Sequence, residues 1–302
     1  MPKVFISTIS FNNNKVTNDL LKSIGELKTD NVGIFVVVVD NGSKSNYKAD
    51  KKYNKFTLKI IRSEKNLGFS GGQNLGIRYA LDNGADYVLI LNNDTLLDKN
   101  LILALIDSLN ENVGIVAPKI YFAKGYEFHK DKYSEKEMGK IIWYAGGIMD
   151  WPNIIARHRG VDKVDKGQYE ILEQTDFASG CCMLVKREVF EKIGLFDEKY
   201  FLYYEDNDFS QRAKIAGFDI GYQSNAVMWH KNAASAGGSG SELQDYYITR
   251  NRLIFGFKYA SLRSKTALFK ESMRLIASGR KWQKKGVIDF YLRKFGKGSF
   301  SI

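Results

Sequence analysis

Four short apolar runs separated by helix-like segments constrain the fold of this chain more than any other feature. The runs are rich in β-branched side chains, as strands buried on both faces are. They span residues 4–8, 33–39, 58–61 and 87–91, and the helix-like segments lie near residues 16–27, 72–83 and 99–110. This alternation predicts an α/β fold with a doubly wound, mostly parallel central sheet, whose ligands gather at the carboxyl ends of the strands.

Polar residues stand where three of the predicted strands end. They are Ser10 and Asn12 after the first run, Asp40 and Gly42 after the second, and Asn92, Asn93 and Asp94 after the fourth. Since these ends share one edge of a parallel sheet, we expect the polar residues to share a site. Asp40 allows two interpretations: a contact to a nucleobase imide or ribose hydroxyl, or a role only in the turn that Asp-Asn-Gly-Ser favours.

A glycine-rich stretch at residues 66–74 adjoins the second predicted helix. Its candidate binding residues are Asn66, Gly68, Gly71 and Asn74. Backbone amides and a helix N-terminus can meet phosphate at such a position. The stretch matches neither GxGxxG nor GxxxxGK[ST], which argues against a dinucleotide-dependent oxidoreductase and against a P-loop ATPase.

Carboxylates and a histidine suggest the chemistry. Transfer of a sugar from a nucleotide diphosphate needs a cation for the departing diphosphate and a carboxylate to take the proton of the attacking hydroxyl. Asp94 and His230 suit the cation, and Asp206, beside Glu205, suits the proton. Each residue alone also fits helix capping or ordinary packing, whereas their combination in this order is more specific.

Composition indicates a folded protein of enzyme size, with 302 residues of which 44% are hydrophobic and 13% aromatic. The sequence contains no run of about eighteen uninterrupted apolar residues. Residues 1–3 lead directly into the first apolar run instead of a signal peptide, so we expect a cytoplasmic location. Cys181 and Cys182 are adjacent, which offers neither a disulfide framework nor CxxC spacing and predicts reduced core residues.

The positive charge is concentrated at the C-terminal end. Residues 261–302 hold eleven Lys or Arg against two acidic residues, and so carry nine units of the net charge of +11. Apolar residues are interleaved with these bases, as in basic amphipathic helices that lie on anionic membranes. We therefore predict a membrane contact, with a helical pair packed on the rest of the chain as the alternative. Nucleic acid is not expected, because no recognised binding motif accompanies the charge.

Six segments, in order, resemble the motifs of an inverting family 2 glycosyltransferase, nearest to the rhamnosyltransferase-like branch. They are residues 10–12, 39–43, 66–74, 91–94, 179–187 and 204–212. The resemblance covers roughly residues 3–255. It implies a GT-A, Rossmann-like nucleotide-diphospho-sugar transferase fold over residues 1–260, with a nucleotide-binding half (1–118), an acceptor and catalytic half (119–260), and a basic helical tail (261–302).

The same resemblance implies roles for individual residues. Asp206 is the general base, Glu205 supports acceptor binding or orients the base, and Asp94 and His230 bind a divalent metal, Mn²⁺ or Mg²⁺. The nucleotide-binding set comprises Ser10, Asn12, Asp40, Gly42, Asn66, Gly68, Gly71, Asn74, Asn92 and Asn93. Asn92 replaces the first aspartate of the family's DXD motif. Fewer anionic ligands weaken the binding of a bare cation, so we predict a metal bound only together with nucleotide.

The remaining segments give weaker predictions. Residues 121–174 are interpreted as acceptor-side loops and hairpins, and residues 235–241 as a flexible linker or a lid over the donor. The helix expected from about residue 242 carries Arg250 and Arg252, one of which is expected to reach the diphosphate.

Taken together, the sequence predicts an inverting hexosyltransferase-type enzyme at the inner face of the cell membrane, to which it binds peripherally. It would move a sugar, with rhamnose favoured, from a dTDP or UDP donor to a saccharide or lipid-linked acceptor in cell-surface polysaccharide synthesis. One alternative is a catalytically silent GT-A scaffold that binds membrane or a partner through its basic tail. A weaker alternative is a nucleotidyltransferase that shares the sheet.

Overall fold

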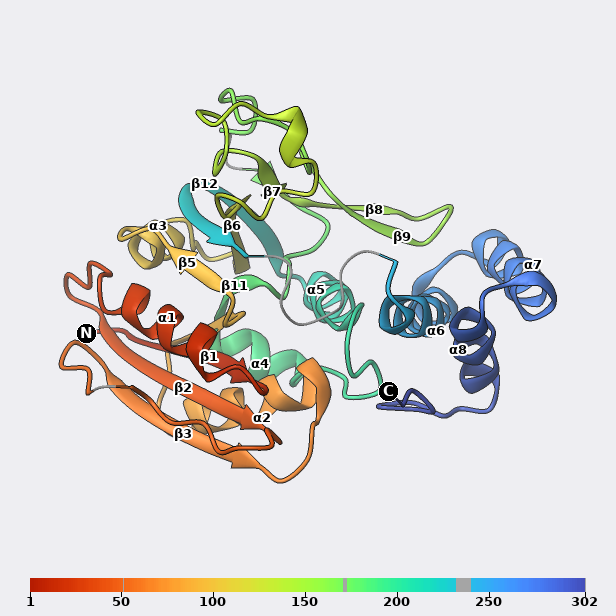
Figure 1. Ribbon diagram of the computed structural model, residues 1–302, viewed down its shortest axis with the longest axis horizontal. Helices are drawn as coiled ribbons and strands as arrows, with labels where there is room; N and C mark the ends of the chain where they lie inside the picture. The colour runs from red at the N-terminus through yellow and green to blue at the C-terminus, as the bar shows by residue number, and fades with distance from the viewer. Residues whose placement is uncertain (51, 171–172, 232–239, 302) are drawn as a thin grey trace.

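The computed structural model describes residues 1–50, 52–170, 173–231 and 240–301 (Figure 1). The strands are β1 (Lys3–Ser10), β2 (Gly33–Asn41), β3 (Thr57–Ser63), β4 (Tyr87–Leu91), β5 (Thr95–Leu97), β6 (Val113–Phe122), β7 (Ile142–Tyr144), β8 (Gly147–Asp150), β9 (Ile155–His158), β10 (Glu173–Gln174), β11 (Cys182–Lys186) and β12 (Asp219–His230). The helices are α1 (Asn14–Ile24), α2 (Gly68–Asp82), α3 (Leu101–Asp107), α4 (Arg187–Ile193), α5 (Glu205–Ile215), α6 (Glu242–Tyr259), α7 (Leu262–Ser278) and α8 (Lys281–Tyr291), with a short 3₁₀ turn at Lys130–Lys132.

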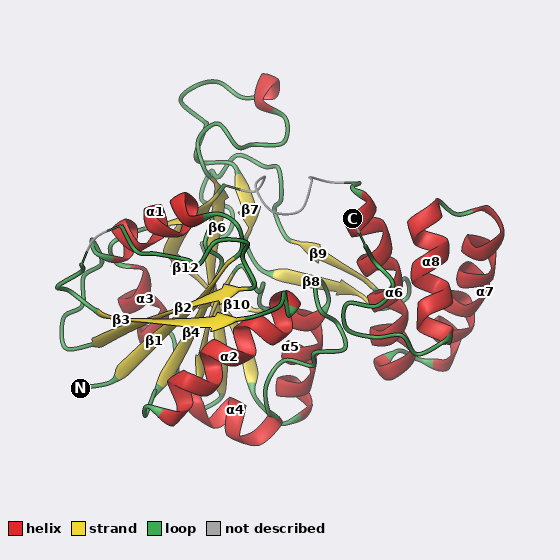
Figure 2. Ribbon diagram, turned by 60° about the horizontal axis from the view of Figure 1, so that its bottom comes forward, coloured by secondary structure: helices red, strands yellow, loops and turns green. Residues whose placement is uncertain are grey.

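The central sheet is mostly parallel and has the order β10-β12-β6-β11-β4-β1-β2-β3. β1 pairs in parallel with β2 and β4, and β2 with β3. β11 runs antiparallel to both β4 and β6, so β6 points the same way as β4, and β12 is parallel to β6. Helices α2, α4 and α5 lie along one face and α1 and α3 along the other (Figure 2). The predicted α/β architecture is confirmed.

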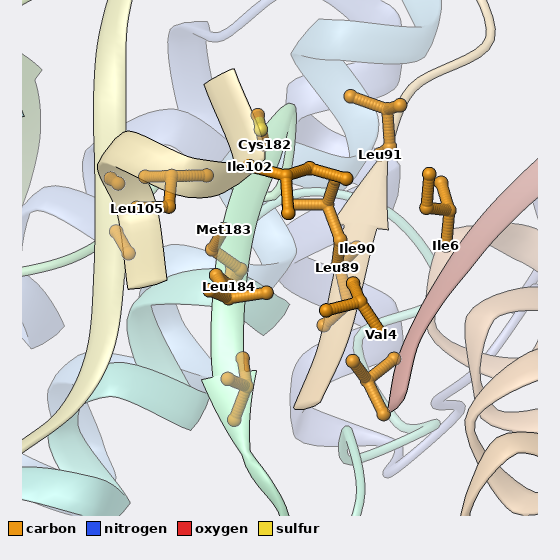
Figure 3. Packing of buried hydrophobic residues seen from close by; sticks show 14 of the residues in the cluster. Val4, Ile6, Leu89, Ile90, Leu91, Ile102, Leu105, Cys182, Met183 and Leu184 are labelled. Atoms are coloured by element: carbon orange, nitrogen blue, oxygen red, sulfur yellow. The ribbon is translucent and has the colours of Figure 1, made fainter. Parts of the chain in front are cut away.

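The core explains why the four apolar runs form strands. Val36, Val37, Val38 and Val39 are fully buried, which requires side chains packed on both faces of β2. In the middle of the sheet, Ile6 of β1 and residues 89–91 of β4 pack beside Met183 and its neighbours of β11 (Figure 3). Cys181 and Cys182 are buried free thiols, as predicted.

The glycines of residues 68–76 have a packing role that the sequence did not reveal. α2 begins at Gly68, so the glycines lie inside the helix and not before it. A Cβ on Gly72 would lie 2.7 Å from Ile9 Cδ1, and one on Gly76 would lie 2.1 Å from Ser7 Oγ. Glycine therefore lets α2 approach β1 closely.

The C-terminal helices α6, α7 and α8 form a group beside the sheet domain, and the β8–β9 hairpin extends toward them (Figure 1). Leu253 of α6, Leu268 of α7 and Val287 of α8 share one buried cluster with Ile154, at the end of the hairpin. Part of the tail is thus packed on the chain, as the alternative interpretation expected. Among the described residues, no helix combines the length and apolar character needed to span a bilayer.

Candidate active site

The predicted metal ligands lie together. Asp94 follows β4, and β5 pairs with the end of β12 so that Thr95 stands opposite His230. His230 Nε2 lies 3.1 Å from Asp94 Oδ1, and both side chains are buried. Burial opposes the charge on Asp94, but the hydrogen bond with His230 and the nearby Lys231 hold the pKa of Asp94 below its usual value.

The two candidate catalytic carboxylates open helix α5. Glu205 is buried and its Oε2 has no hydrogen-bond partner, while Asp206 Oδ1 accepts hydrogen bonds from the backbone and side-chain nitrogens of Asn207, both at 2.8 Å. Burial, with the adjacent charge of Asp206, raises the pKa of Glu205 well above its usual value. Burial also raises the pKa of Asp206, although its hydrogen bonds oppose that shift. A carboxylate with a raised pKa accepts protons more readily.

The segment before β11 connects these two parts of the site. Gly180 N donates to Asp206 Oδ2 at 3.0 Å, and Cys181 O accepts from Asn92 N at 2.9 Å. Burial, followed by the charge of Asp94, raises the pKa of the Cys181 thiol well above its usual value. The structure therefore brings the Asn92–Asp94 loop and the start of α5 to one place, across β11 and β4.

A hydrogen-bond relay joins the end of β1 to the same loop. Asn93 Nδ2 donates to Thr17 Oγ1 at 2.9 Å, and Thr17 Oγ1 donates to Ser10 Oγ at 2.9 Å. Thr17, on α1, did not stand out in the sequence because it follows no strand. The relay fixes the side chain of Asn93 relative to Ser10.

At the end of β2, Asp40 organises the turn that follows it. Its carboxylate accepts from Ser43 N, Tyr47 N and Arg62 Nη1, at 3.1, 2.9 and 2.6 Å. Although burial opposes ionisation, these bonds hold the pKa of Asp40 below its usual value. The turn role is therefore present, and a contact to a nucleobase stays a prediction. Gly42 is left-handed, with φ +77, and lies against the backbone of residue 65.

Asn12 and Asn66 also hold turns at this edge of the sheet. Asn12 is exposed, with φ +54, and its Oδ1 accepts from Lys44 N at 2.8 Å. Asn66 Oδ1 accepts from Gly68 N at 2.8 Å and from Asn41 Nδ2 at 3.2 Å.

The structure corrects the expectation of bare amides at the start of α2. Phe69 N and Ser70 N donate to Phe201 O, at 2.6 and 3.3 Å, so the helix N-terminus binds a carbonyl of the chain itself. Gly68 permits this approach, since a Cβ there would lie 2.3 Å from Phe201 O. Gly71 is buried beside Leu67.

Asn74, predicted to bind nucleotide, is instead bonded to the chain itself. It is buried, its Nδ2 donates to Phe196 O and to Glu198 Oε1, both at 3.0 Å, and its Oδ1 accepts from Phe196 N at 3.0 Å. The polar atoms of Asn74 are thus used to hold residues 196–198.

The expectation that an arginine of α6 reaches the diphosphate is likewise corrected. Arg250 is fully buried and donates to the carbonyls of residues 199 and 200, while Arg252 forms an ion pair with Glu271 at 2.7 Å. A third arginine, Arg212 of α5, forms an ion pair with Asp208 at 2.8 Å. Of the predicted lid, residues 235–239 lie outside the described residues.

The site fits a divalent cation in its chemistry. A carboxylate and an imidazole are adjacent, and His230 Nδ1 is a buried nitrogen without a hydrogen-bond partner. Carboxylate oxygen and imidazole nitrogen are suitable ligands for Mn²⁺. Within the described ranges, no cluster of three or more His, Cys, Asp or Glu side chains is arranged to hold a metal. Asp94 and His230 are therefore the two candidate protein ligands.

Comparisons with known proteins agree on the family. Residues 6–194 match the family described as Glycosyl transferase family 2. The low-salt glycan biosynthesis hexosyltransferase Agl10 of Haloferax volcanii is 30% identical over 220 residues, which are 72% of this chain and 66% of that protein. The N-acetylglucosaminyl-diphospho-decaprenol L-rhamnosyltransferase of Mycobacterium tuberculosis is 28% identical over 220 residues, 68% of each chain. The dTDP-rhamnosyl transferase RfbF of Shigella flexneri is 28% identical over 190 residues, 63% of this chain and 56% of that protein.

Solved structures with low sequence identity share the fold. A mannosyltransferase of Pyrobaculum calidifontis, PcManGT, in complex with GDP-Man and Mn²⁺, has a TM-score of 0.54 at 13% identity, covering 100% of this chain and 76% of that one. GalNAc-T7 with UDP, GalNAc and Mn²⁺ has a TM-score of 0.61 at 14% identity, covering 97% and 57%. The fold is therefore that of the GT-A glycosyltransferases. With the family match over residues 6–194, this chain belongs to glycosyl transferase family 2.

Proposed function

We propose that this chain is an inverting glycosyltransferase that moves a sugar from a nucleotide-diphosphate donor, dTDP or UDP, to a saccharide or lipid-linked acceptor in cell-surface polysaccharide synthesis. The observation that carries the proposal is the backbone link through residues 180–181. Gly180 N donates to Asp206, and Cys181 O accepts from Asn92 N, in the loop whose Asp94 contacts His230. Rhamnose is the favoured sugar, because two of the relatives are named as rhamnosyltransferases.

In this mechanism Asp206 removes the proton of the acceptor hydroxyl as that oxygen attacks the anomeric carbon. Gly180 N and Asn207 fix the orientation of the Asp206 carboxylate, and burial keeps it a better base than a solvated aspartate. Attack from the face opposite the leaving diphosphate inverts the anomeric configuration.

Asp94 and His230 would hold a divalent cation, Mn²⁺ or Mg²⁺, together with the diphosphate. When bound, the cation offsets the negative charge of the departing diphosphate. Two protein ligands leave most coordination positions to the nucleotide and water, which supports the prediction that metal binds only with nucleotide. Of the predicted nucleotide set, the residues at the ends of β1, β2 and β4 remain candidates for the donor.

The test uses dTDP-rhamnose with a polyprenyl-diphosphate-linked N-acetylglucosamine as acceptor, with UDP-sugars as second donors, and mass spectrometry of the product. Asp206→Asn should lower kcat by about 10²–10⁴-fold, while dTDP binding in the presence of Mn²⁺ persists. Asp107→Asn, at the exposed end of α3, is the matched control. A wild-type protein that transfers no sugar from any donor, yet binds nucleotide, would favour the silent scaffold.

We also propose that the tail rests on an anionic membrane at the cytoplasmic face. One face of α7 exposes Leu262, Phe269, Met273 and Ile276. These residues recur at helical spacing, and Arg263, Lys270 and Arg274 are exposed beside them. An apolar stripe flanked by bases is typical of helices that lie in the interfacial region of a bilayer.

Point substitutions test this surface better than removal of residues 261–302, because α8 is part of the buried core. Phe269→Glu should reduce flotation of the protein with phosphatidylglycerol vesicles. Ile215→Glu, at an apolar position on α5 that is more exposed than Phe269 (68% against 46%), should leave flotation unchanged. Equal flotation of both variants and the wild type would contradict the membrane proposal. The division at residues 260 and 261 stays a prediction.

A further inference from the structure

The segment that leads into the catalytic carboxylates has a backbone that its own residues disfavour. Phe201, Tyr203 and Tyr204 have φ values of +65, +68 and +70, and Tyr204 is directly followed by Glu205. Bulky side chains rarely adopt the left-handed region. Three such residues in one short segment persist only where surrounding groups hold the backbone in place.

One side of this segment is held by α2. Phe201 O accepts from the first free amides of that helix, Phe69 N and Ser70 N. This contact fixes the segment at one carbonyl only.

The opposite side is held by two neighbouring residues of α6. Asn251 Nδ2 lies within hydrogen-bond distance of three carbonyls, those of Tyr200, Leu202 and Tyr203, at 2.9, 2.7 and 2.7 Å. Arg250 Nη2 adds bonds to Tyr200 O at 3.0 Å and to residue 199 at 3.3 Å. Both side chains are fully buried. One amide group therefore spans the segment in which the left-handed residues occur.

The tail in turn holds Arg250. Arg250 Nε donates to Asn251 Oδ1 at 3.0 Å, and its guanidinium contacts Tyr246, whose hydroxyl donates to the buried Asp289 of α8. Beyond α8 the chain returns, and a Cβ on Gly298 would lie 2.6 Å from Arg250 Nη1. The arrangement runs without a break from α8, through Arg250 and Asn251, to the segment before Glu205.

We propose that Arg250 and Asn251 are positioning residues for the catalytic carboxylates, and that α8 completes their support. Neither residue touches the reacting atoms in this proposal. They act by fixing the backbone at residues 199–204, and so the place from which Asp206 faces the acceptor. The proposal rests on the proposed function of Asp206 and adds that the C-terminal helices are required for catalysis, apart from any contact with membrane.

The main variant is Asn251→Ala in the full-length chain, assayed with the donor and acceptor described above. A carboxylate displaced by about 1 Å lowers the rate by about 100-fold, so kcat per folded enzyme should fall by that order while KM for the donor changes little. Hydrogen exchange of the peptide covering residues 199–207 should become faster. Arg250→Lys keeps the positive charge and one donor nitrogen. The fall in kcat and the increase in exchange rate should therefore both be smaller than in Asn251→Ala.

Val189→Ala is the matched control, since Val189 of α4 is fully buried and lies outside the site. It should lower thermal stability but leave kcat and the exchange of residues 199–207 unchanged. Unchanged exchange of that peptide in Asn251→Ala overturns the positioning role. If the wild type transfers no sugar, the proposed function fails, and hydrogen exchange alone still decides the positioning role. If Asn251→Ala does not fold, Arg250→Lys decides on the same readouts.

Discussion

Among the acidic residues at the start of α5, we expect substitution of Asp208 to lower the stability of the protein, whereas substitution of Asp206 should lower its activity. Asp208 is fully buried, and its carboxylate accepts from Lys258 Nζ, Tyr259 Oη and Arg212 Nε, each at 2.8 Å. In Asp208→Asn one oxygen becomes an NH₂ group, so at least one cation loses its partner. Because Arg212 and Lys258 are 19% and 42% exposed, water can partly solvate the cation left behind. We therefore expect a loss of about 1.5–3 kcal/mol, the contribution of hydrogen bonds to a charged group.

Urea unfolding at pH 7 measures this loss as a fall in the free energy of unfolding. Asp19→Asn is the control, because Asp19 is partly exposed and pairs with Lys15, Lys22 and Lys231 at the longer distances of 3.8, 3.5 and 3.8 Å. It should lose less than about 1 kcal/mol. A loss in Asp208→Asn no larger than the control's would refute the reasoning.

The pH dependence provides a second check on Asp208. Burial opposes ionisation, but the hydrogen bonds from Lys258 and Arg212 hold the pKa of Asp208 below its usual value. A carboxyl with a lowered folded-state pKa stabilises the protein above its unfolded pKa, about 3.9, and loses this contribution as pH falls further. The stability difference between wild type and Asp208→Asn should therefore stay constant from pH 7 to about 5 and narrow only below about pH 4.

Three further outcomes are expected. Gly68→Ala should destabilise the protein by more than about 1 kcal/mol in thermal unfolding, because φ is +72 and the new Cβ would meet Phe201 O; an unchanged midpoint would argue against that contact. His230→Ala should weaken Mn²⁺-dependent dTDP binding by about 10-fold or more in calorimetry, and equal affinity would exclude His230 as a ligand. In a plot of kcat against pH, activity should fall on the acidic side with an apparent pKa above about 3.9, the ordinary value of an aspartate, because the pKa of Asp206 is raised. An apparent pKa at or below that value would contradict Asp206 as the base.

The sheet was largely predictable because its strands are buried on both faces. Such strands appear as continuous apolar runs, so β1, β2, β3 and β4 could be located from residues 1–91 alone. The short strands β8 and β9 lack such a run, and their bounds came only from the structure. The start of α2 was misplaced because its glycines, which we expected before the helix as a phosphate-binding stretch, lie inside it and are required for close packing on β1.

Candidate site residues at strand ends could be selected from the sequence, whereas the helical residues that hold the backbone before Glu205 could not. Asp94 and His230 stand at strand ends, and the structure brings them within hydrogen-bond distance. Asn251 lies in the middle of a helix, where an asparagine has no pattern of its own. Its partners are backbone carbonyls about fifty positions away, which only the folded chain reveals.

The most direct test of the account is the thermal stability of the wild type with dTDP, UDP and GDP, each with and without Mn²⁺ or Mg²⁺. A ligand that binds only the folded state raises the apparent stability. The account predicts a rise with dTDP or UDP that requires the metal and disappears in the double variant Asp94→Asn, His230→Ala. No rise with any nucleotide, or a rise that survives in that variant, would contradict it.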